Sequence, residues 1–155
     1  MKLYLSDKNG VCHPVEEKLI EDKSNVIKEY LQFSVPQSSE DILPLTSIEG
    51  EILAKIIAWV YRPQPESLDL DKSQGFFVRD LLLASEFLDM PLLSRQIISW
   101  LEKQLTSSNV VDFWIFSKDF HIIKLESVCW KFLVESQIEK FSASVLLTVC
   151  RLDLD

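Results

Sequence analysis

The residues that could take part in metal binding or redox chemistry are few and widely spaced. The chain of 155 residues contains two histidines and three cysteines: His13, His121, Cys12, Cys129 and Cys150. Cys12 and His13 are adjacent, so on a strand their side chains would point to opposite faces. A tetrahedral zinc site needs closely spaced ligand pairs such as Cys-x-x-Cys, and the sequence contains none. We therefore expect free, reduced thiols and no bound metal.

Acid–base and phosphate chemistry are equally poorly supported. A nucleophile needs a base within hydrogen-bond reach, and we expect both histidines to be structural, His13 on a strand and His121 in a helix–helix connection. Neighbouring carboxylates such as Glu16 and Glu17 fall in predicted turns or helix ends, where there is no burial to raise a pKa. The three glycines are isolated and form no phosphate-binding loop. The sequence thus predicts neither an enzyme nor a cofactor.

The charge of the chain narrows the choice of partners. Twenty-four acidic residues against 16 basic ones give a formal net charge of −8. A field of this sign repels phosphate backbones and anionic membrane surfaces, so we expect protein partners and neither nucleic acid nor membrane. No signal peptide is evident, and the apolar runs are too short to span a bilayer. The expected location is the cytoplasm, the nucleus or both.

The N-terminal residues predict a β-hairpin. Apolar stretches at 3–5 and 11–15 flank Asn9 and Gly10, two residues that tolerate a positive φ. Pro14 has no N–H to donate, so the second strand should lie at the edge of a sheet.

Helices and one more strand follow the hairpin. Residues 16–33 predict a helix in two pieces, with Ser24 as the N-cap of the second piece. A short strand is predicted over 42–45. The sequence from Thr46 to Glu49 has the pattern of a capping box, which favours a helix that begins there and ends near Pro63.

The rest of the chain is predicted to be helical after an acidic connector at 62–75. Asp89 is the expected N-cap of a helix that has Pro91 in its first turn. No internal repeat is evident. The predicted helices cover 76–88, 91–103, about ten residues around 110–115, 123–135 and 143–149.

The N-terminal stretch from Lys2 to Gly10, followed by residues 43–45 and 52–59, resembles the BTB/POZ superfamily. The most specific similarity lies in residues 74–90, where an LxxAxxxLD run ends a helix. Within the superfamily the chain most resembles the small cullin adaptors that receive F-box proteins, and Elongin C. The resemblance implies an α+β, BTB/POZ-like fold over residues 1–104, in which helices cover a small three-stranded sheet.

The stretch 109–133 is similar to the first helix pair of the BACK segment, which follows BTB domains in cullin substrate adaptors. The resemblance implies an all-helical, truncated BACK-like extension over residues 105–155. Tryptophan is enriched at protein interfaces. We expect a face for a C-terminal partner to include Trp114, Phe120 and Trp130.

The function that the resemblance implies is that of a non-enzymatic adaptor, which links a cullin scaffold to a substrate receptor or a substrate in a ubiquitin ligase. In the family the corresponding helix end docks a cullin N-terminal domain, and by position this face comprises Glu86, Phe87 and Met90. The F-box adaptors typically have Asn and Tyr at the first two places. The extra dimerisation helix and strand of many BTB domains have no counterpart here, which favours a monomer or heterodimer. The alternative is a BTB-fold scaffold or host-mimicking protein that binds a non-cullin partner.

Overall fold

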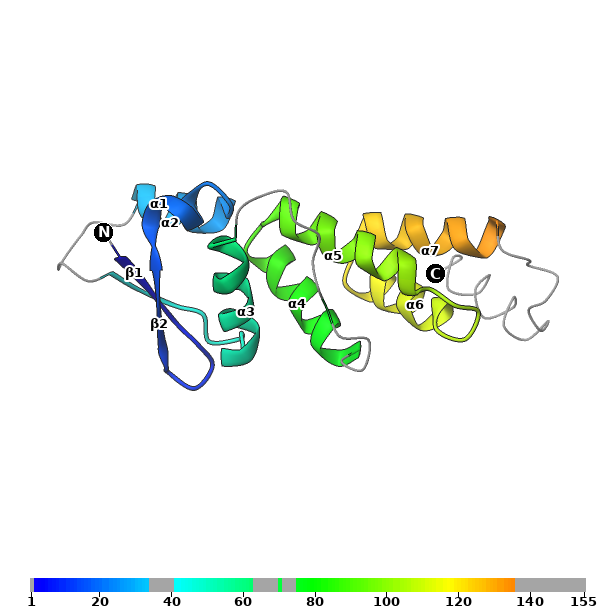
Figure 1. Cartoon of the computed structure of the whole chain (residues 1–155), viewed down its shortest axis with the longest axis horizontal. Helices are drawn as coiled ribbons and strands as arrows, with labels where there is room; N and C mark the ends of the chain where they lie inside the picture. The colour runs from blue at the N-terminus through cyan, green and yellow to red at the C-terminus, as the bar shows by residue number, and fades with distance from the viewer. Residues whose placement is uncertain (1, 34–40, 63–69, 71–74, 136–155) are drawn as a thin grey trace. The chain divides into compact units, whose positions relative to one another are not determined.

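The computed structural model describes residues 2–33, 41–62, 70 and 75–135. The chain divides into two compact units, Met1–Ile97 and Ile98–Asp155. The described residues form three strands and seven helices, so the predicted α+β class is confirmed (Figure 1). The predicted helix at 143–149 lies outside them. The elements are β1 (Lys2–Ser6), β2 (Cys12–Glu16), α1 (Glu17–Glu21), α2 (Asn25–Phe33), β3 (Asp41–Pro44), α3 (Gly50–Val60), α4 (Gly75–Phe87), α5 (Pro91–Gln104), α6 (Val110–Asp119) and α7 (Ile123–Glu135).

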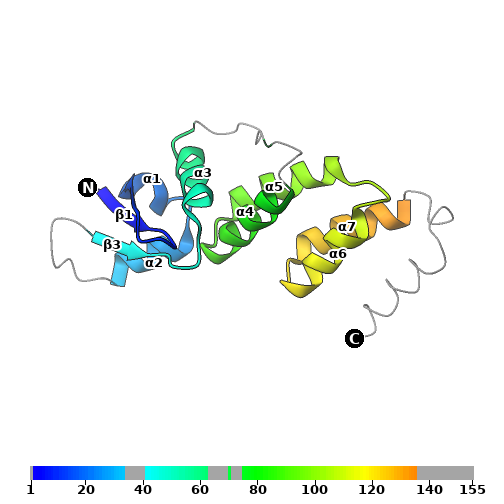
Figure 2. The same cartoon turned by 90° about the horizontal axis from the view of Figure 1, so that it is seen from below.

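The sheet of the first unit has the strand order β2-β1-β3. β1 pairs antiparallel with β2 and parallel with β3, which the chain reaches through α1 and α2. Leu3 and Leu5 alternate with more exposed neighbours on the central strand, and they are fully buried together with Val15 of β2. Figures 1 and 2 show α1, α2 and α3 around this small sheet. One face of the sheet therefore contributes to the core.

The predicted hairpin forms, but its two strands are joined by a longer loop than predicted. Of the two central residues only Gly10 has a positive φ, at 80°. The N–H of Asp7 donates to the carbonyl oxygen of Val11 at 2.9 Å, which closes a loop longer than the two-residue turn that Asn9 and Gly10 suggest. β2 lies at the sheet edge, as Pro14 predicted.

The exposed edge of β2 is closed from within the molecule. Pro14 has no N–H to offer another strand, and the N–H of Glu16 donates to Tyr61 Oη at 3.0 Å. Tyr61 is the C-cap residue of α3, so the end of that helix occupies one of the N–H groups that an added strand would need.

Ser24 is the N-cap of α2, as predicted, and its side chain also binds the backbone at the end of α4. Its Oγ accepts the N–H of Ile27 at 3.2 Å and donates to the carbonyl oxygen of Leu88 at 2.6 Å, across 64 residues of sequence. The side chain of Ser24 is buried. A single hydroxyl group thus satisfies two backbone groups that would otherwise be buried without partners.

The capping box predicted from Thr46 to Glu49 is wrong. α3 begins at Gly50, and its N-cap residue Glu49 makes no side-chain capping bond. The preceding loop is instead held by the hairpin, because the N–H of Lys8 donates to the carbonyl oxygen of Ile48 at 2.8 Å. A Cβ atom at Gly50 would lie 2.6 Å from Asp7 Oδ2, so only glycine fits there without a shift. Tertiary contacts therefore decide where α3 starts.

Asp89 ends α4 and does not cap α5, which corrects the sequence prediction. Its φ is 48°, and the N–H of Met90 donates to the carbonyl oxygen of Ser85 at 2.9 Å. This is the Schellman turn, whose left-handed position usually holds glycine. The Asp89 carboxylate accepts from Asn25 Nδ2 at 2.9 Å, so it faces α2. α5 does begin with a proline, as predicted.

The same turn joins α6 to α7, which reveals a repeat that the sequence does not show. His121 has a φ of 57°, and the N–H of Ile122 donates to the carbonyl oxygen of Ser117 at 2.9 Å. Ser85 and Ser117 occupy matching places, are buried, and donate their hydroxyls to the carbonyl oxygen three residues earlier. The two helix pairs share this turn and the buried serine although few of their residues are identical.

Replacement of His121 by glycine should stabilise the protein. Glycine removes the left-handed backbone strain, which costs roughly 1 kcal/mol for another residue, so the free energy of unfolding should rise by a similar amount. Urea denaturation measures it. Asp89→Gly is the matched control and should gain less, because it also loses the bond to Asn25. A lower stability for His121→Gly would contradict the assigned strain.

Candidate protein-interaction surfaces

The described residues contain no group of three or more His, Cys, Asp or Glu side chains placed to hold a metal ion. Within them, Cys12 is exposed and Cys129 is buried, and both are free thiols. Burial raises the pKa of Cys129 to about 12, so its thiolate is suppressed at neutral pH.

The carboxyl group of Asp80, which the sequence did not single out, has a raised pKa. The main cause is burial, and the negative charge of Glu49 adds to it.

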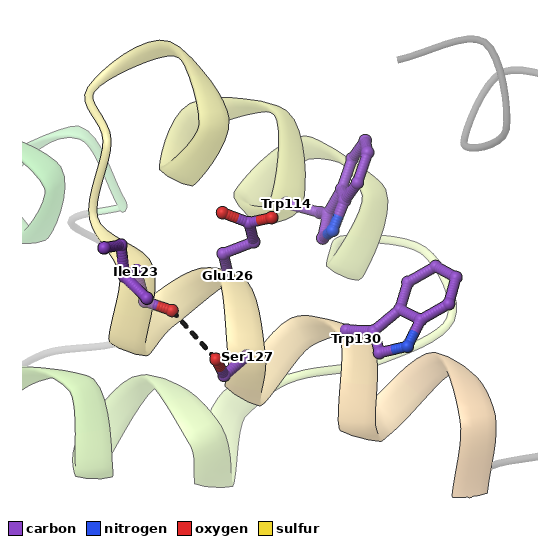
Figure 3. A pocket seen from close by; sticks show the side chains of 5 residues that line it. All are labelled: Trp114, Ile123, Glu126, Ser127 and Trp130. Carbon is purple, nitrogen blue, oxygen red and sulfur yellow. Dashed lines mark hydrogen bonds between the residues drawn. The ribbon is translucent and has the colours of Figure 1, made fainter. Parts of the chain in front are cut away.

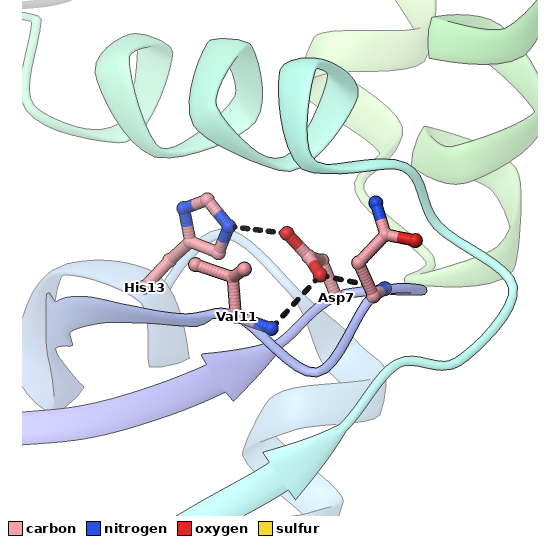
Figure 4. A network of polar contacts seen from close by, with 4 residues as sticks. Asp7, Val11 and His13 are labelled. Carbon is pink, nitrogen blue, oxygen red and sulfur yellow. Dashed lines mark hydrogen bonds and ion pairs between the residues drawn. The ribbon is translucent and has the colours of Figure 1, made fainter.

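A histidine–carboxylate pair lies beneath the first residue of α3. His13 Nε2 is 2.9 Å from Asp7 Oδ2, while Asp7 Oδ1 accepts the N–H groups of Asn9 at 2.8 Å and Val11 at 3.1 Å (Figure 4). The hydrogen bond from His13 is the main cause of a lowered pKa of Asp7, with the two backbone bonds adding to it and desolvation opposing it. Each oxygen of this buried carboxylate has a partner, so the pair secures the hairpin loop. His13 is thus structural, as expected, although the sequence analysis did not predict Asp7 as its partner.

The first candidate surface lies at the C-terminal turn of α4. Glu86 is exposed, and 58% of the surface of Phe87 is accessible. Met90, predicted for the same face, is only 1% exposed, because the Schellman turn directs the residue after Asp89 into the core. The accessible predicted face therefore comprises Glu86 and Phe87. Leu92, in the first turn of α5, is exposed as well and was not predicted.

The second candidate surface is a groove of about 320 Å³ in the α6–α7 pair. Figure 3 shows the indole rings of Trp114 and Trp130 on one side of this pair, with the Glu126 carboxylate beside Trp114. Trp114 is 1% exposed, whereas Trp130 is 46% exposed. Phe120 is exposed but does not line the groove, so the structure brings together two of the three predicted C-terminal residues.

A basic side chain covers the inner indole. Lys118 Nζ lies 5.2 Å from the ring centroid of Trp114 and 3.2 Å from a carboxylate oxygen of Glu126. A cation over an aromatic face is attracted to the ring, and the carboxylate neutralises its charge. The groove thus has an apolar floor and one charged wall.

Apolar side chains that were not predicted as a surface form a stripe along α7. Ile123 is 74%, Trp130 46% and Val134 53% exposed. Leu125 and Leu133 are buried on another face of the helix. We call Ile123, Trp130 and Val134 the outer stripe. Single exposed apolar residues are common, but three on one helix face indicate a contact surface.

Comparison with known proteins identifies the fold. No protein-family model and no curated protein matches the chain. Among solved structures, the BTB domain of human gigaxonin superimposes with a TM-score of 0.51 and 17% sequence identity, over 63% of this chain and 75% of that one. The fold is BTB/POZ-like, as the resemblance implied. No helix among the described residues is long and apolar enough to cross a membrane.

Removal of the Asp7 carboxylate should change how stability depends on pH. A lowered pKa contributes stability above the ordinary value of 3.8, which is lost as the pH falls through the folded-state value. Asp7→Asn should therefore be less stable than the wild type at pH 7 and lose less stability below about pH 5. Urea denaturation between pH 7 and pH 3 measures both effects. Glu51→Gln, at an exposed position, is the control, and identical acid profiles for Asp7→Asn and the wild type would refute the pairing.

The two described thiols should differ in reactivity. In the native protein at pH 8, iodoacetamide should label exposed Cys12 and leave Cys129 unmodified, because Cys129 is buried and almost entirely protonated. Mass spectrometry of the digested protein distinguishes the two sites. In denaturing urea both should react alike. Equal labelling of the native protein would show that Cys129 is accessible.

Proposed function

We propose that the protein is a non-enzymatic adaptor, which links a cullin scaffold to a substrate receptor or a substrate in a ubiquitin ligase. One observation carries this proposal: Phe87 is exposed beside Glu86 at the end of α4 on a BTB/POZ-like fold. By resemblance, this helix end is the cullin-docking position. Aromatic residues supply much of the binding energy at protein interfaces, and an aromatic ring left in water at this place suits such a contact.

The turn that follows Phe87 is held in a single geometry. Ser24 binds the carbonyl oxygen of Leu88, and Asn25 binds both the carboxylate and the carbonyl oxygen of Asp89. A docking residue next to a fixed turn loses little freedom on binding, so less of the contact energy is spent on ordering it. This rigidity supports a docking role for Phe87.

In this proposal the two parts of the chain bind different partners. Residues 1–104 would form the BTB/POZ-like part and residues 105–155 the truncated BACK-like segment, with the groove and Phe120 available to the second partner. Exposed apolar residues in each of the two compact units suit a molecule that binds two partners. The protein would act in the cytoplasm or nucleus, as a monomer or as a heterodimer with its partner.

A second candidate function is a BTB-fold scaffold, or a host-mimicking protein, that binds a non-cullin partner. Glu86 places a carboxylate where the F-box adaptors typically have asparagine, and the burial of Met90 removes one residue from the expected face. A charge at the centre of an interface must be paired or it weakens binding, so the partner could differ from that of the adaptors.

Binding to purified cullin N-terminal domains tests the two functions. One cullin should bind at micromolar concentrations, and Phe87→Ala should weaken its binding at least about tenfold, as expected for an aromatic hot spot. Phe120→Ala, equally exposed but in the other unit, is the matched control and should have little effect. No binding to any cullin at tens of micromolar would rule out the adaptor. A dominant non-cullin partner from cells, lost with Phe87→Ala, would favour the scaffold.

A further inference from the structure

We propose that the outer stripe of α7 and the adjoining groove bind one amphipathic helix of a partner protein, with acidic residues along one flank and a neutral hydrogen-bond acceptor along the other. This inference rests on the proposed function, because it gives the chemistry of the second partner. Three features of the α6–α7 pair support it: the apolar stripe, an unsatisfied buried donor and the placement of charges.

The outer stripe matches the contact face of a helix. Ile123, Trp130 and Val134 are spaced i, i+7 and i+11, so they lie in a row along the 13 residues of α7, a length of about 20 Å. A helix that is apolar on two faces is typically covered on both. Leu125 and Leu133 mark the face that is buried within the described structure.

The packing of the helix pair does not require this apolar stripe. In the matching pair, α5 has Pro91 and Glu102 at the places of Ile123 and Val134, and both are exposed. The same Schellman turn and the same buried serine form there without apolar residues at these two positions. The turn therefore does not require Ile123 and Val134, and a binding role explains these two residues. Trp130 has an apolar counterpart in Ile98, which is buried, whereas Trp130 is exposed.

The groove contains a buried donor without an acceptor. Trp114 Nε1 is the one buried side-chain nitrogen or oxygen in the described residues that lacks a hydrogen-bond partner. An indole N–H can only donate, and leaving it unsatisfied costs about 1–3 kcal/mol. Since Trp114 lines the groove, an oxygen that enters there can accept this bond. Because Glu126 already pairs with Lys118, a second carboxylate in the groove would have no cation left to pair with, so we infer a neutral acceptor such as a glutamine side chain.

The other edge of the outer stripe has two lysines and, at the last residue of α7, the carboxylate of Glu135. Lys124 and Lys131 are exposed and directly follow Ile123 and Trp130, which places both lysines along the same side of α7. An acidic flank on the bound helix would face them and fix its orientation. Antiparallel pairing of two α7 helices would instead bring the lysines of both copies together, which disfavours a second copy of this chain.

A synthetic helical peptide is the probe. It has about 18 residues, leucines at i, i+4, i+7 and i+11, glutamates on one flank and glutamines on the other. Fluorescence anisotropy should show saturable binding to the full chain. Trp130→Ala should weaken it at least about tenfold, while Phe33→Ala, at an exposed aromatic residue of the other unit, should not change it. The double variant Lys124→Glu, Lys131→Glu should bind this peptide more weakly. It should bind more tightly a version of the peptide in which lysines replace the glutamates.

The acceptor is tested by a double-mutant cycle. Replacing the peptide's glutamines by alanine should weaken binding to the wild type about three- to tenfold and leave binding to Trp114→Phe unchanged. A downfield shift of the Trp114 indole N–H resonance in the wild-type complex gives the same information if Trp114→Phe fails to fold. Equal losses with both proteins, or an unshifted resonance, would overturn the assigned acceptor.

Three results would overturn the proposal as a whole. The first is an absence of saturable peptide binding, and the second is binding that Trp130→Ala does not weaken. The third is a dimer of the full chain that Ile123→Asp dissociates, because a second copy would then occupy the outer stripe. Phe87→Ala should leave peptide binding unchanged. A failure of this inference is therefore distinguishable from a failure of cullin binding.

Discussion

The hydroxyl group of Ser24 connects the two ends of the first unit. It caps α2 through the N–H of Ile27 and donates to the carbonyl oxygen of Leu88, two groups that are far apart in sequence and both buried. Because both backbone groups bind the same side chain, loss of this hydroxyl would affect the start of α2 and the turn that ends α4 together. Phe87 lies directly before that turn.

The two Schellman turns show how one local geometry serves two different surfaces. The turn at Asp89 is fastened to α2 by Asn25, and the exposed aromatic residue Phe87 precedes it on α4. At His121 the corresponding exposed apolar residues lie on the following helix, α7, beginning with Ile123. In both cases a buried serine donates a hydrogen bond to a carbonyl oxygen of its own helix. The turn therefore forms whichever residues are exposed around it.

Sequence reasoning succeeded where the signal is local and failed where a distant contact decides. The Ser24 cap and the hairpin were predictable because the residues involved are neighbours. Asp89 was misassigned because an aspartate takes the place that glycine usually marks, and its partner Asn25 belongs to another helix. The outer stripe was missed because α7 is apolar on two faces, and periodicity does not tell which face is covered: Ile123 and Leu133 look alike in sequence.

The bond between Glu16 and Tyr61 has a consequence for synthesis on the ribosome. The hairpin leaves the exit tunnel 45 residues before the tyrosine that protects it. During that interval the Glu16 amide is available to a β-strand of any neighbouring nascent chain, and Pro14 alone guards the strand. We therefore expect this edge to have its full protection only after α3 has emerged and Tyr61 has reached Glu16.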